Sequence, residues 1–313
     1  MRILLIKMSS LGDVIHTFPA LSDIQKQVPQ LALTWAIEPA FAPLAKAHPE
    51  VKNCIEIPIR AWRKNKWQNR HLMQQAYKAL RKESYDIIID AQGLMKSAIV
   101  AKIAKGKRIG YNKKCIKEPL ARLFYQQRYF CDPSAHAIDK IRNLCAQALG
   151  YATSQSPHHF GLKEGFKVQK PARPYVIFLH STTWPTKHYP NDYWIALGKI
   201  ANDAGFSVYL PHGNGEEEKR SYTIAKTLED AVVPKRASLH AIAQMIVDAS
   251  GVISVDTGLG HLSGALDQVS LGLFGPTNAA INGIMGPFSQ SLSSTISCAP
   301  CLKRHCQHPD RFQ

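Results

Sequence analysis

The chain has 313 residues, of which 45% are hydrophobic, 39 are Lys or Arg and 23 are Asp or Glu, for a formal net charge of +16. This length accommodates two domains of ordinary size, and the composition is typical of a globular protein. No apolar run approaches the ~18 residues of a membrane span, and the first residues lack the layout of a secretory signal. The seven cysteines are scattered and odd in number, which favours a reducing compartment over a disulfide framework. We therefore expect a cytoplasmic protein.

The positive charge is concentrated in the first half of the chain. Residues 1–150 contain 25 basic and 11 acidic side chains, a net charge of +14, whereas residues 151–313 contain 14 and 12, a net charge of +2. This asymmetry favours a polyanionic partner for the first half, such as nucleic acid, anionic lipid headgroups or a phosphorylated glycolipid. The alternative is a basic surface that only keeps the protein in solution.

Apolar strands alternate with helical patterns along the whole chain. The expected strands are residues 3–6, 33–37, 55–57, 87–90, 176–180, 207–210, 252–255 and 271–274. The expected helices include residues 72–81, 137–149, 193–204 and 239–249. This alternation predicts an α/β fold with parallel, doubly wound sheets. Gly and Pro are frequent between residues 154 and 174, so we expect domains at 1–155 and 175–313 with a linker at 156–174.

The first strand leads into a short polar turn. Residues 2–6 form a buried strand pattern, residues 7–13 a small glycine-bearing loop, and Val14 opens a helical pattern. The carboxyl edge of a parallel sheet, where such a loop lies, is where α/β proteins bind ligands. Asp13 in this loop is predicted to be either a helix cap or a general base.

The two halves of the chain repeat this arrangement. In each half the first strand leads into a loop with Ser or Thr, at residues 7–10 and 180–183. In each half a later strand also ends in an aspartate, Asp90 or Asp256, followed by a Gly-Leu turn. We expect two similar α/β domains that face each other across a cleft.

The second half has a candidate phosphate site after its third strand. The strand ends at Asp256, two glycines follow, and a helix is expected to begin near His261. The N–H groups at a helix start bind phosphate oxygens, and Asp256 could hydrogen-bond sugar hydroxyls. Alternatively, Asp256 is a helix cap. The motif is neither a dinucleotide fingerprint nor a Walker loop.

Two further loops could bind a sugar nucleotide. Thr182, Thr183 and Lys187 follow a strand and could neutralise a leaving diphosphate without a metal. The alternative is a polar loop with a surface lysine. One carboxylate among residues 216–218 could bind a ribose diol, although three glutamates also suit an ordinary helix start.

Residues 60–70 contain two tryptophans among five cations, which suits anionic phosphates at a membrane surface and also nucleic acid.

At the other end of the chain, Cys298, Cys301 and Cys306 have ligand-like residue types, and His305 or His308 could complete a zinc site. Their spacing lacks a clear second pair, so we favour free thiols.

Five motifs together resemble one family, the ADP-heptose:lipopolysaccharide heptosyltransferases of type I. They are KMSSLGDVIHTFPAL (7–21), DAQGLMKSA (90–98), HSTTWPTKHYP (180–190), VDTGLGHLSGAL (255–266) and LFGPT (273–277). The resemblance covers essentially the whole chain. It implies a GT-B fold of two Rossmann-like domains, an N-terminal one for the acceptor and a C-terminal one for the donor.

The resemblance also implies an inverting transfer of heptose from ADP-heptose to Kdo2-lipid A, without metal or cofactor, by a peripheral protein at the cytoplasmic face of the inner membrane. Asp13 would be the general base, and Lys187 would stabilise the leaving diphosphate. The implied donor-binding residues are Thr182, Thr183, Lys187, Glu217, Asp256, Thr257, Gly258 and His261. The implied acceptor-binding residues are Ser10, Gly12, Arg60, Arg63, Lys64 and Lys96.

Related chains continue beyond a cysteine-bearing tail into a helix that returns to the first domain. This sequence stops at Gln313, so we expect that helix to be absent or short.

Alternatives to the predicted function are transfer to a later core heptose, and a non-catalytic α/β protein that binds a nucleotide sugar, RNA or another polyanion. The presence of Asp13 and Lys187 favours catalysis, and the missing glycine fingerprint disfavours a nicotinamide oxidoreductase.

Overall fold

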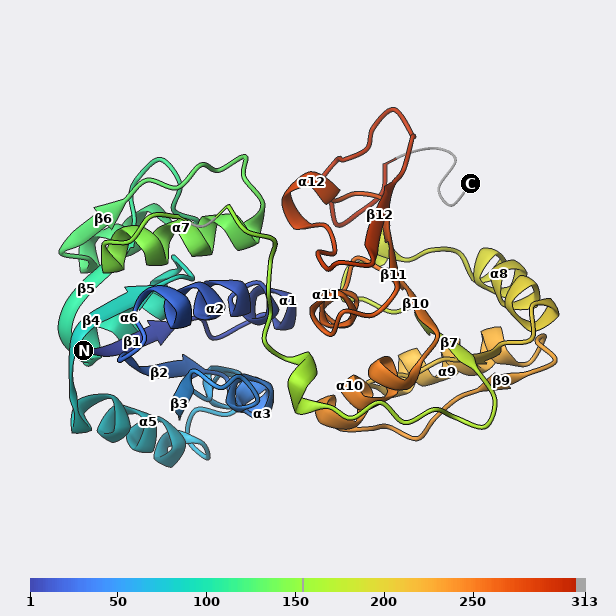
Figure 1. Ribbon diagram of the computed structural model, residues 1–313, viewed down its shortest axis with the longest axis horizontal. Helices are drawn as coiled ribbons and strands as arrows, with labels where there is room; N and C mark the ends of the chain where they lie inside the picture. The colour runs from blue at the N-terminus through green and yellow to red at the C-terminus, as the bar shows by residue number, and fades with distance from the viewer. Residues whose placement is uncertain (154, 308–313) are drawn as a thin grey trace. The chain divides into compact units, whose positions relative to one another are not determined.

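The computed structural model describes residues 1–153 and 155–307, and the chain forms two compact units, Met1–Gly161 and Leu162–Gln313 (Figure 1). Each unit contains a six-stranded, all-parallel sheet with helices packed around it. The tail predictions at His308 and at residues 311–313 lie outside the described residues.

The sheet of the first unit has the strand order β3-β2-β1-β4-β5-β6. Its strands are β1 (Arg2–Ile6), β2 (Ala32–Ile37), β3 (Val51–Glu56), β4 (Ser84–Asp90), β5 (Lys105–Tyr111) and β6 (Gln127–Tyr129). Its α-helices are α1 (Leu11–Ile15), α2 (Phe18–Gln27), α3 (Ala42–Lys46), α4 (Ile59–Lys64), α5 (Arg70–Lys82), α6 (Met95–Ile103) and α7 (Ala137–Leu149). The chain reverses its direction of travel across the sheet between β1 and β4, which is where doubly wound sheets bind ligands.

The second unit repeats this order, read as β9-β8-β7-β10-β11-β12. Its strands are β7 (Tyr175–Leu179), β8 (Ser207–Tyr209), β9 (Ala231–Val232), β10 (Gly251–Val255), β11 (Ser270–Phe274) and β12 (Ser289–Ser293). Its α-helices are α8 (Asn191–Asp203), α9 (Gly215–Ala225), α10 (Leu239–Asp248), α11 (Gly258–Ala265) and α12 (Ala279–Asn282). The equivalent reversal lies between β7 and β10.

Apolar central strands form the cores of both units. Residues Ile3–Ile6 of β1 are fully buried, as expected for a strand covered on both faces. In the second unit, Phe178 of β7 packs on Trp194 of α8 with their ring centroids 4.9 Å apart. These central strands hold the loops at their carboxyl ends in fixed positions.

All eight strands expected from the sequence are present with shifted ends. The four expected helices are also present, and α7 has the expected bounds. Four strands were missed: β5, β6, β9 and β12. The last three are short or polar edge strands, and β5 alternates charged residues with small ones. Two helix starts were predicted wrongly, because α1 begins at Leu11 rather than at Val14, and α11 begins at Gly258 rather than near His261.

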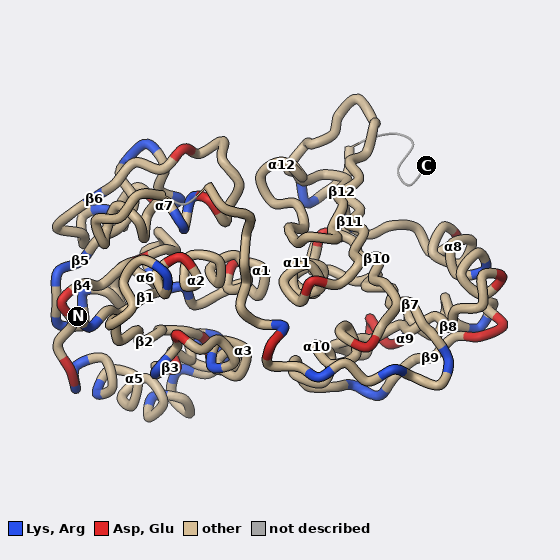
Figure 2. Tube along the Cα trace, viewed as in Figure 1, with Lys and Arg blue, Asp and Glu red and all other residues tan. Residues whose placement is uncertain are grey.

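Basic residues are prominent in the first unit, along α5 and β5 for example (Figure 2). None of the described helices combines the length and the apolar character needed to cross a bilayer. The excess of basic residues in the first half of the sequence therefore lies at the surface of a folded unit, and the core of that unit is apolar.

Close packing of α11 against the loop that precedes β12 gives a stability prediction. A Cβ atom at Gly264 would lie 2.4 Å from the Met285 carbonyl oxygen, whereas one at Gly215 would meet nothing within 4 Å. We expect Gly264→Ala to lower the free energy of unfolding by about 1–3 kcal/mol, since the clash is with backbone. Gly215→Ala is the matched control and should be neutral or slightly stabilising. Urea unfolding monitored by circular dichroism measures both, and equal stability of the two variants would contradict the packing described.

Candidate active site

In the first unit, Asp13 lies in the first turn of α1, immediately after the β1 loop. Its Oδ2 accepts hydrogen bonds from the Ser10 amide at 3.0 Å and from the Ser10 hydroxyl at 3.1 Å. Ser10 and Asp13 thus form a capping box that fixes the start of α1. The sequence offered a cap or a base as alternatives for Asp13, and the structure shows that one oxygen caps the helix.

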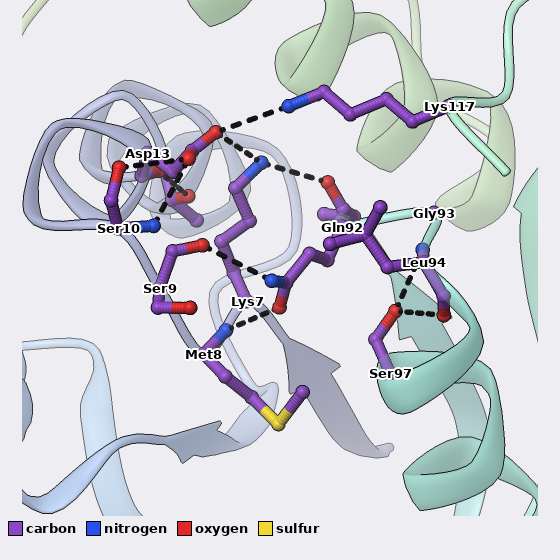
Figure 3. A network of polar contacts seen from close by, with 12 residues as sticks. Lys7, Met8, Ser9, Ser10, Asp13, Gln92, Gly93, Leu94, Ser97 and Lys117 are labelled. Atoms are coloured by element: carbon purple, nitrogen blue, oxygen red, sulfur yellow. Dashed lines mark hydrogen bonds and ion pairs between the residues drawn. The ribbon is translucent and has the colours of Figure 1, made fainter. Parts of the chain in front are cut away.

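The second oxygen of Asp13 lies between two lysines (Figure 3). Its Oδ1 is 3.2 Å from Nζ of Lys7 and 3.6 Å from Nζ of Lys117. Burial alone would raise the pKa of Asp13, but the charges of Lys7 and Lys117, with the Ser10 amide, hold that pKa well below its ordinary value. Asp13 is therefore ionised at every physiological pH.

The β4 loop locks the β1 loop in place (Figure 3). Gln92 accepts a hydrogen bond from the Met8 amide at 2.9 Å and donates to the Ser9 carbonyl at 3.1 Å. Asp90 accepts from the Gln92 and Gly93 amides and from the Tyr125 hydroxyl, the last at 2.6 Å. Residues 90–94 (DAQGL) therefore hold the loop that carries Asp13 in position by hydrogen bonds.

The predicted acceptor-binding residues lie around the same loops. Ser10 is exposed, Gly12 is buried in α1, and Lys96 donates to the Ser9 hydroxyl at 3.1 Å. Burial lowers the pKa of Lys96, and Arg60 and Arg63 act in the same direction through their charges. The charge of Glu38 opposes this shift, so the structure brings Arg60, Arg63 and Lys96 within electrostatic reach of one another with Glu38 beside them.

Arg60, Arg63 and Lys64 all lie on α4, and Lys64 is exposed in its last turn. The guanidinium of Arg60 lies 5.2 Å from the ring centre of Phe41, and its backbone amide donates to Glu38 at 3.2 Å. These contacts fix the start of α4, and they leave the Arg63 and Lys64 side chains exposed.

In the second unit, Asp256 and Lys187 form a close ion pair. Nζ of Lys187 lies 2.7 Å from Oδ2 of Asp256, and the Thr277 hydroxyl donates to the same oxygen at 2.6 Å. His261 Nε2 lies 3.7 Å from Oδ1. Burial would raise the pKa of Asp256, but the contacts with His261, Lys187 and Thr277 hold that pKa well below its ordinary value. Asp256 is not the helix cap, because Thr257 occupies the N-cap position of α11.

The start of α11 and the β7 loop lie beside this pair. Gly258 is the first residue of α11, and His261 is buried one turn later. Thr182 donates to the Asp256 carbonyl at 3.3 Å, whereas Thr183 is exposed. These contacts bring Thr182, Lys187, Asp256, Thr257, Gly258 and His261 together at the carboxyl ends of β7 and β10.

Glu217 lies in the first turn of α9 and serves the local backbone. Its carboxylate accepts from the Gly213 amide at 2.7 Å and from the Asn214 side chain at 2.8 Å. Its charge acts on His188, whose ring bonds to the Thr182 carbonyl at 2.9 Å. Glu217 is thus linked electrostatically to the Thr182 loop, and its ribose-binding role stays a prediction.

Sequence reasoning missed Arg220, which holds the β7 loop from α9. Its guanidinium donates to the His180 carbonyl at 2.9 Å, to Asn191 at 2.8 Å, and to the Tyr189 carbonyl. Nothing in a charged helix start distinguishes Arg220 from its neighbours. Lys7 was also missed, although its position directly after a buried strand was a usable signal.

A cavity of about 540 Å³ adjoins Lys187 within the second unit. Its walls are largely apolar and include Phe274, Leu292 and Ile296, together with the cysteines of the tail, Cys298, Cys301 and Cys306. Among residues 1–153 and 155–307 no group of three or more His, Cys, Asp or Glu side chains is arranged to hold a metal ion. The cysteines there are free thiols.

A doubly wound sheet in each unit, with polar side chains at both reversal points, is the architecture of GT-B glycosyltransferases. The structure matches that of E. coli heptosyltransferase WaaC with ADP at a TM-score of 0.89 and 35% identity, over 94% of this chain and 93% of that one. It also matches E. coli ADP-heptose LPS heptosyltransferase II at a TM-score of 0.74 and 19% identity, a likeness of fold.

Sequence comparison agrees with the structural match. Residues 73–310 match the model of glycosyltransferase family 9 (heptosyltransferase). Lipopolysaccharide heptosyltransferase 1 of Pseudomonas aeruginosa is 43% identical, over 98% of this chain and 88% of the relative. The protein of the same name from E. coli K12 is 38% identical, over 91% of each chain. The chain belongs to glycosyltransferase family 9, the heptosyltransferases.

Proposed function

We propose that this enzyme transfers L-glycero-D-manno-heptose from ADP-heptose to a Kdo hydroxyl of Kdo2-lipid A, with inversion and without a metal, in assembly of the lipopolysaccharide inner core. The observation that carries the proposal is the match along nearly the whole chain to WaaC structures with ADP and with ADP-2-deoxy-2-fluoro heptose. The curated relatives named lipopolysaccharide heptosyltransferase 1 support the same activity.

Residues 175–313, which lie within the second unit, are the proposed donor domain. Lys187 neutralises the leaving diphosphate, and the amides at the start of α11, Thr257 and Gly258, with His261, bind its oxygens. Asp256 accepts hydrogen bonds from heptose hydroxyls, and Thr182 and Thr183 add hydroxyl donors. Glu217 binds the ribose. The support is the Lys187–Asp256 pair at the carboxyl ends of β7 and β10, an arrangement that presents a cation and an acceptor together.

Residues 1–155, which lie within the first unit, are the proposed acceptor domain, and residues 156–174 are the proposed linker. Asp13 removes the proton of the Kdo hydroxyl. The hydroxyl oxygen attacks the anomeric carbon of the heptose and displaces ADP in one step, which inverts the configuration of that carbon. Ser10 and Gly12 shape the acceptor loop. Arg60, Arg63, Lys64 and Lys96 bind the anionic groups of the acceptor, which would hold the enzyme at the cytoplasmic face of the inner membrane.

The test is ADP release from ADP-heptose by the purified protein in EDTA, with and without deacylated Kdo2-lipid A. We expect release that depends on the acceptor and persists in EDTA, since Lys187 supplies the charge that a metal would otherwise supply. Release with a heptosylated core but not with Kdo2-lipid A would assign the enzyme to a later heptose. Binding of generic polyanions without ADP release would favour the non-catalytic alternative.

A further inference from the structure

The tail that follows β12 is attached to two loops of the candidate active site. The Thr186 hydroxyl, in the loop that follows β7, donates to the Lys303 carbonyl at 2.8 Å. The Leu302 amide donates at 2.8 Å to the carbonyl of Pro276, in the loop that follows β11. That second loop also donates a hydrogen bond to the carboxylate at the end of β10. Residues 302–304 are therefore held beside the proposed donor site of the second unit.

One indole ring connects this tail to Lys187. Nζ of Lys187 lies 4.6 Å from the centre of the Trp184 ring, and the guanidinium carbon of Arg304 lies 4.8 Å from it. These distances limit the separation of the two cations to one that a diphosphate with a hydrogen bond at each end can span. Arg304 is exposed, and contact with a ring face uses none of its N–H groups, so these donors stay available to an anion.

The proposed donor carries more negative charge than Lys187 alone offsets. Lys187 lies 2.7 Å from Asp256, so the two side chains together carry no net charge. A diphosphate has a negative charge on each phosphate, and more develops on the oxygen that leaves during transfer. Stabilisation of that charge requires cations or N–H groups already aimed at it. A guanidinium suits this task because it binds phosphate through two parallel hydrogen bonds.

We propose that Arg304 binds the diphosphate of the sugar-nucleotide donor together with Lys187, and that Trp184 positions both cations. This inference rests on the proposed function, which places the diphosphate beside Lys187 at the start of α11. Arg304 is a binding residue that the tail contributes to the donor site. Trp184 is a positioning residue, since it acts on the donor through the two cations that contact its ring.

Calorimetric titration with ADP tests the proposal in the wild-type enzyme, Arg304→Met and Arg304→Lys. We expect Arg304→Met to raise the Kd for ADP about 10-fold or more, the usual effect of losing a hydrogen bond between charged groups. Arg304→Lys should recover part of this loss, because lysine keeps the charge but not the planar fork. Arg173→Met changes another exposed arginine of the same unit and should keep the wild-type Kd.

Adenosine gives a readout that a purely structural role of Arg304 would not produce. It lacks the phosphates, so titration followed by NMR should give the same Kd for the wild-type enzyme and Arg304→Met. Equal weakening of ADP and adenosine binding would show that Arg304 only supports the loop, which overturns the inference. An unchanged Kd for ADP in Arg304→Met would overturn it as well.

Two substitutions test the role of Trp184. Trp184→Phe keeps a ring face for the cations, whereas Trp184→Leu removes it, so we expect the leucine variant to bind ADP more weakly than the phenylalanine variant. Equal affinity of the two variants for ADP would contradict a positioning role. If the wild-type enzyme binds ADP but transfers no heptose to any acceptor, the proposed function fails, and the assignment of Arg304 is still decided by the Kd values.

Discussion

Asp13→Asn is expected to lower the rate of heptosyl transfer by about 10²- to 10⁴-fold, the usual contribution of a positioned base. Asparagine is preferred to alanine because its side-chain oxygen can still accept the hydrogen bond from the Ser10 amide, which is 3.0 Å from Oδ2 in the structure. The start of α1 should therefore persist. Steady-state ADP release at saturating donor measures the loss of turnover.

The control for this variant is Asp132→Asn, which changes an exposed aspartate in the same unit. Its turnover should equal that of the wild-type enzyme. Calorimetric titration with ADP should give the same Kd for Asp13→Asn as for the wild-type, because the proposed donor residues belong to the other unit. If Asp13→Asn transfers heptose at a near-wild-type rate, Asp13 is not the base.

Lys187→Met is expected to lower kcat by about 10²- to 10³-fold, as loss of one donor to a developing negative charge does in other enzymes. Methionine fills the volume of the lysine stem but removes the ammonium that lies 2.7 Å from Asp256. Binding of ADP should weaken as well, because the diphosphate loses its cation. Stopped-time assays of ADP release and calorimetry with ADP measure the two effects separately.

Lys199→Met provides the matched comparison, since Lys199 is an exposed lysine on α8 of the same unit. It should change neither kcat nor the affinity for ADP. Lys187→Arg should recover part of the lost activity, because charge is kept while the planar guanidinium has a different geometry. Unchanged turnover in Lys187→Met would show that another group stabilises the leaving diphosphate.

The sequence predicted the central part of both sheets because buried parallel strands are continuous apolar runs. β1, β4, β7 and β10 were all found, and the site loops follow these four strands. The edge strands β6 and β9 have only three and two residues, which is too short for a periodicity to identify them. Their position depends on pairing with a neighbouring strand.

The site was less predictable than the fold because its contacts join residues that are distant in sequence. Lys187 and Asp256 were each proposed to bind the donor, but their ion pair depends on the pairing of β7 with β10. Lys117 reaches Asp13 from a loop more than a hundred residues away. Asp13 itself was placed in a loop because Leu11-Gly12 does not resemble a helix start, although the capping box makes it one.

The ion pair between Lys187 and Asp256 has a consequence for inhibitor design. An anion that approaches Lys187 competes with a carboxylate that the protein supplies at 2.7 Å. A compound with a single negative charge therefore exchanges one partner of the lysine for another and leaves Asp256 buried without its cation, at a cost that offsets much of the gain. An effective ligand needs a second feature, a hydroxyl or ammonium group placed to donate to Asp256. Compounds that carry an acid and a hydrogen-bond donor on adjacent atoms are thus better starting points than simple phosphate mimics.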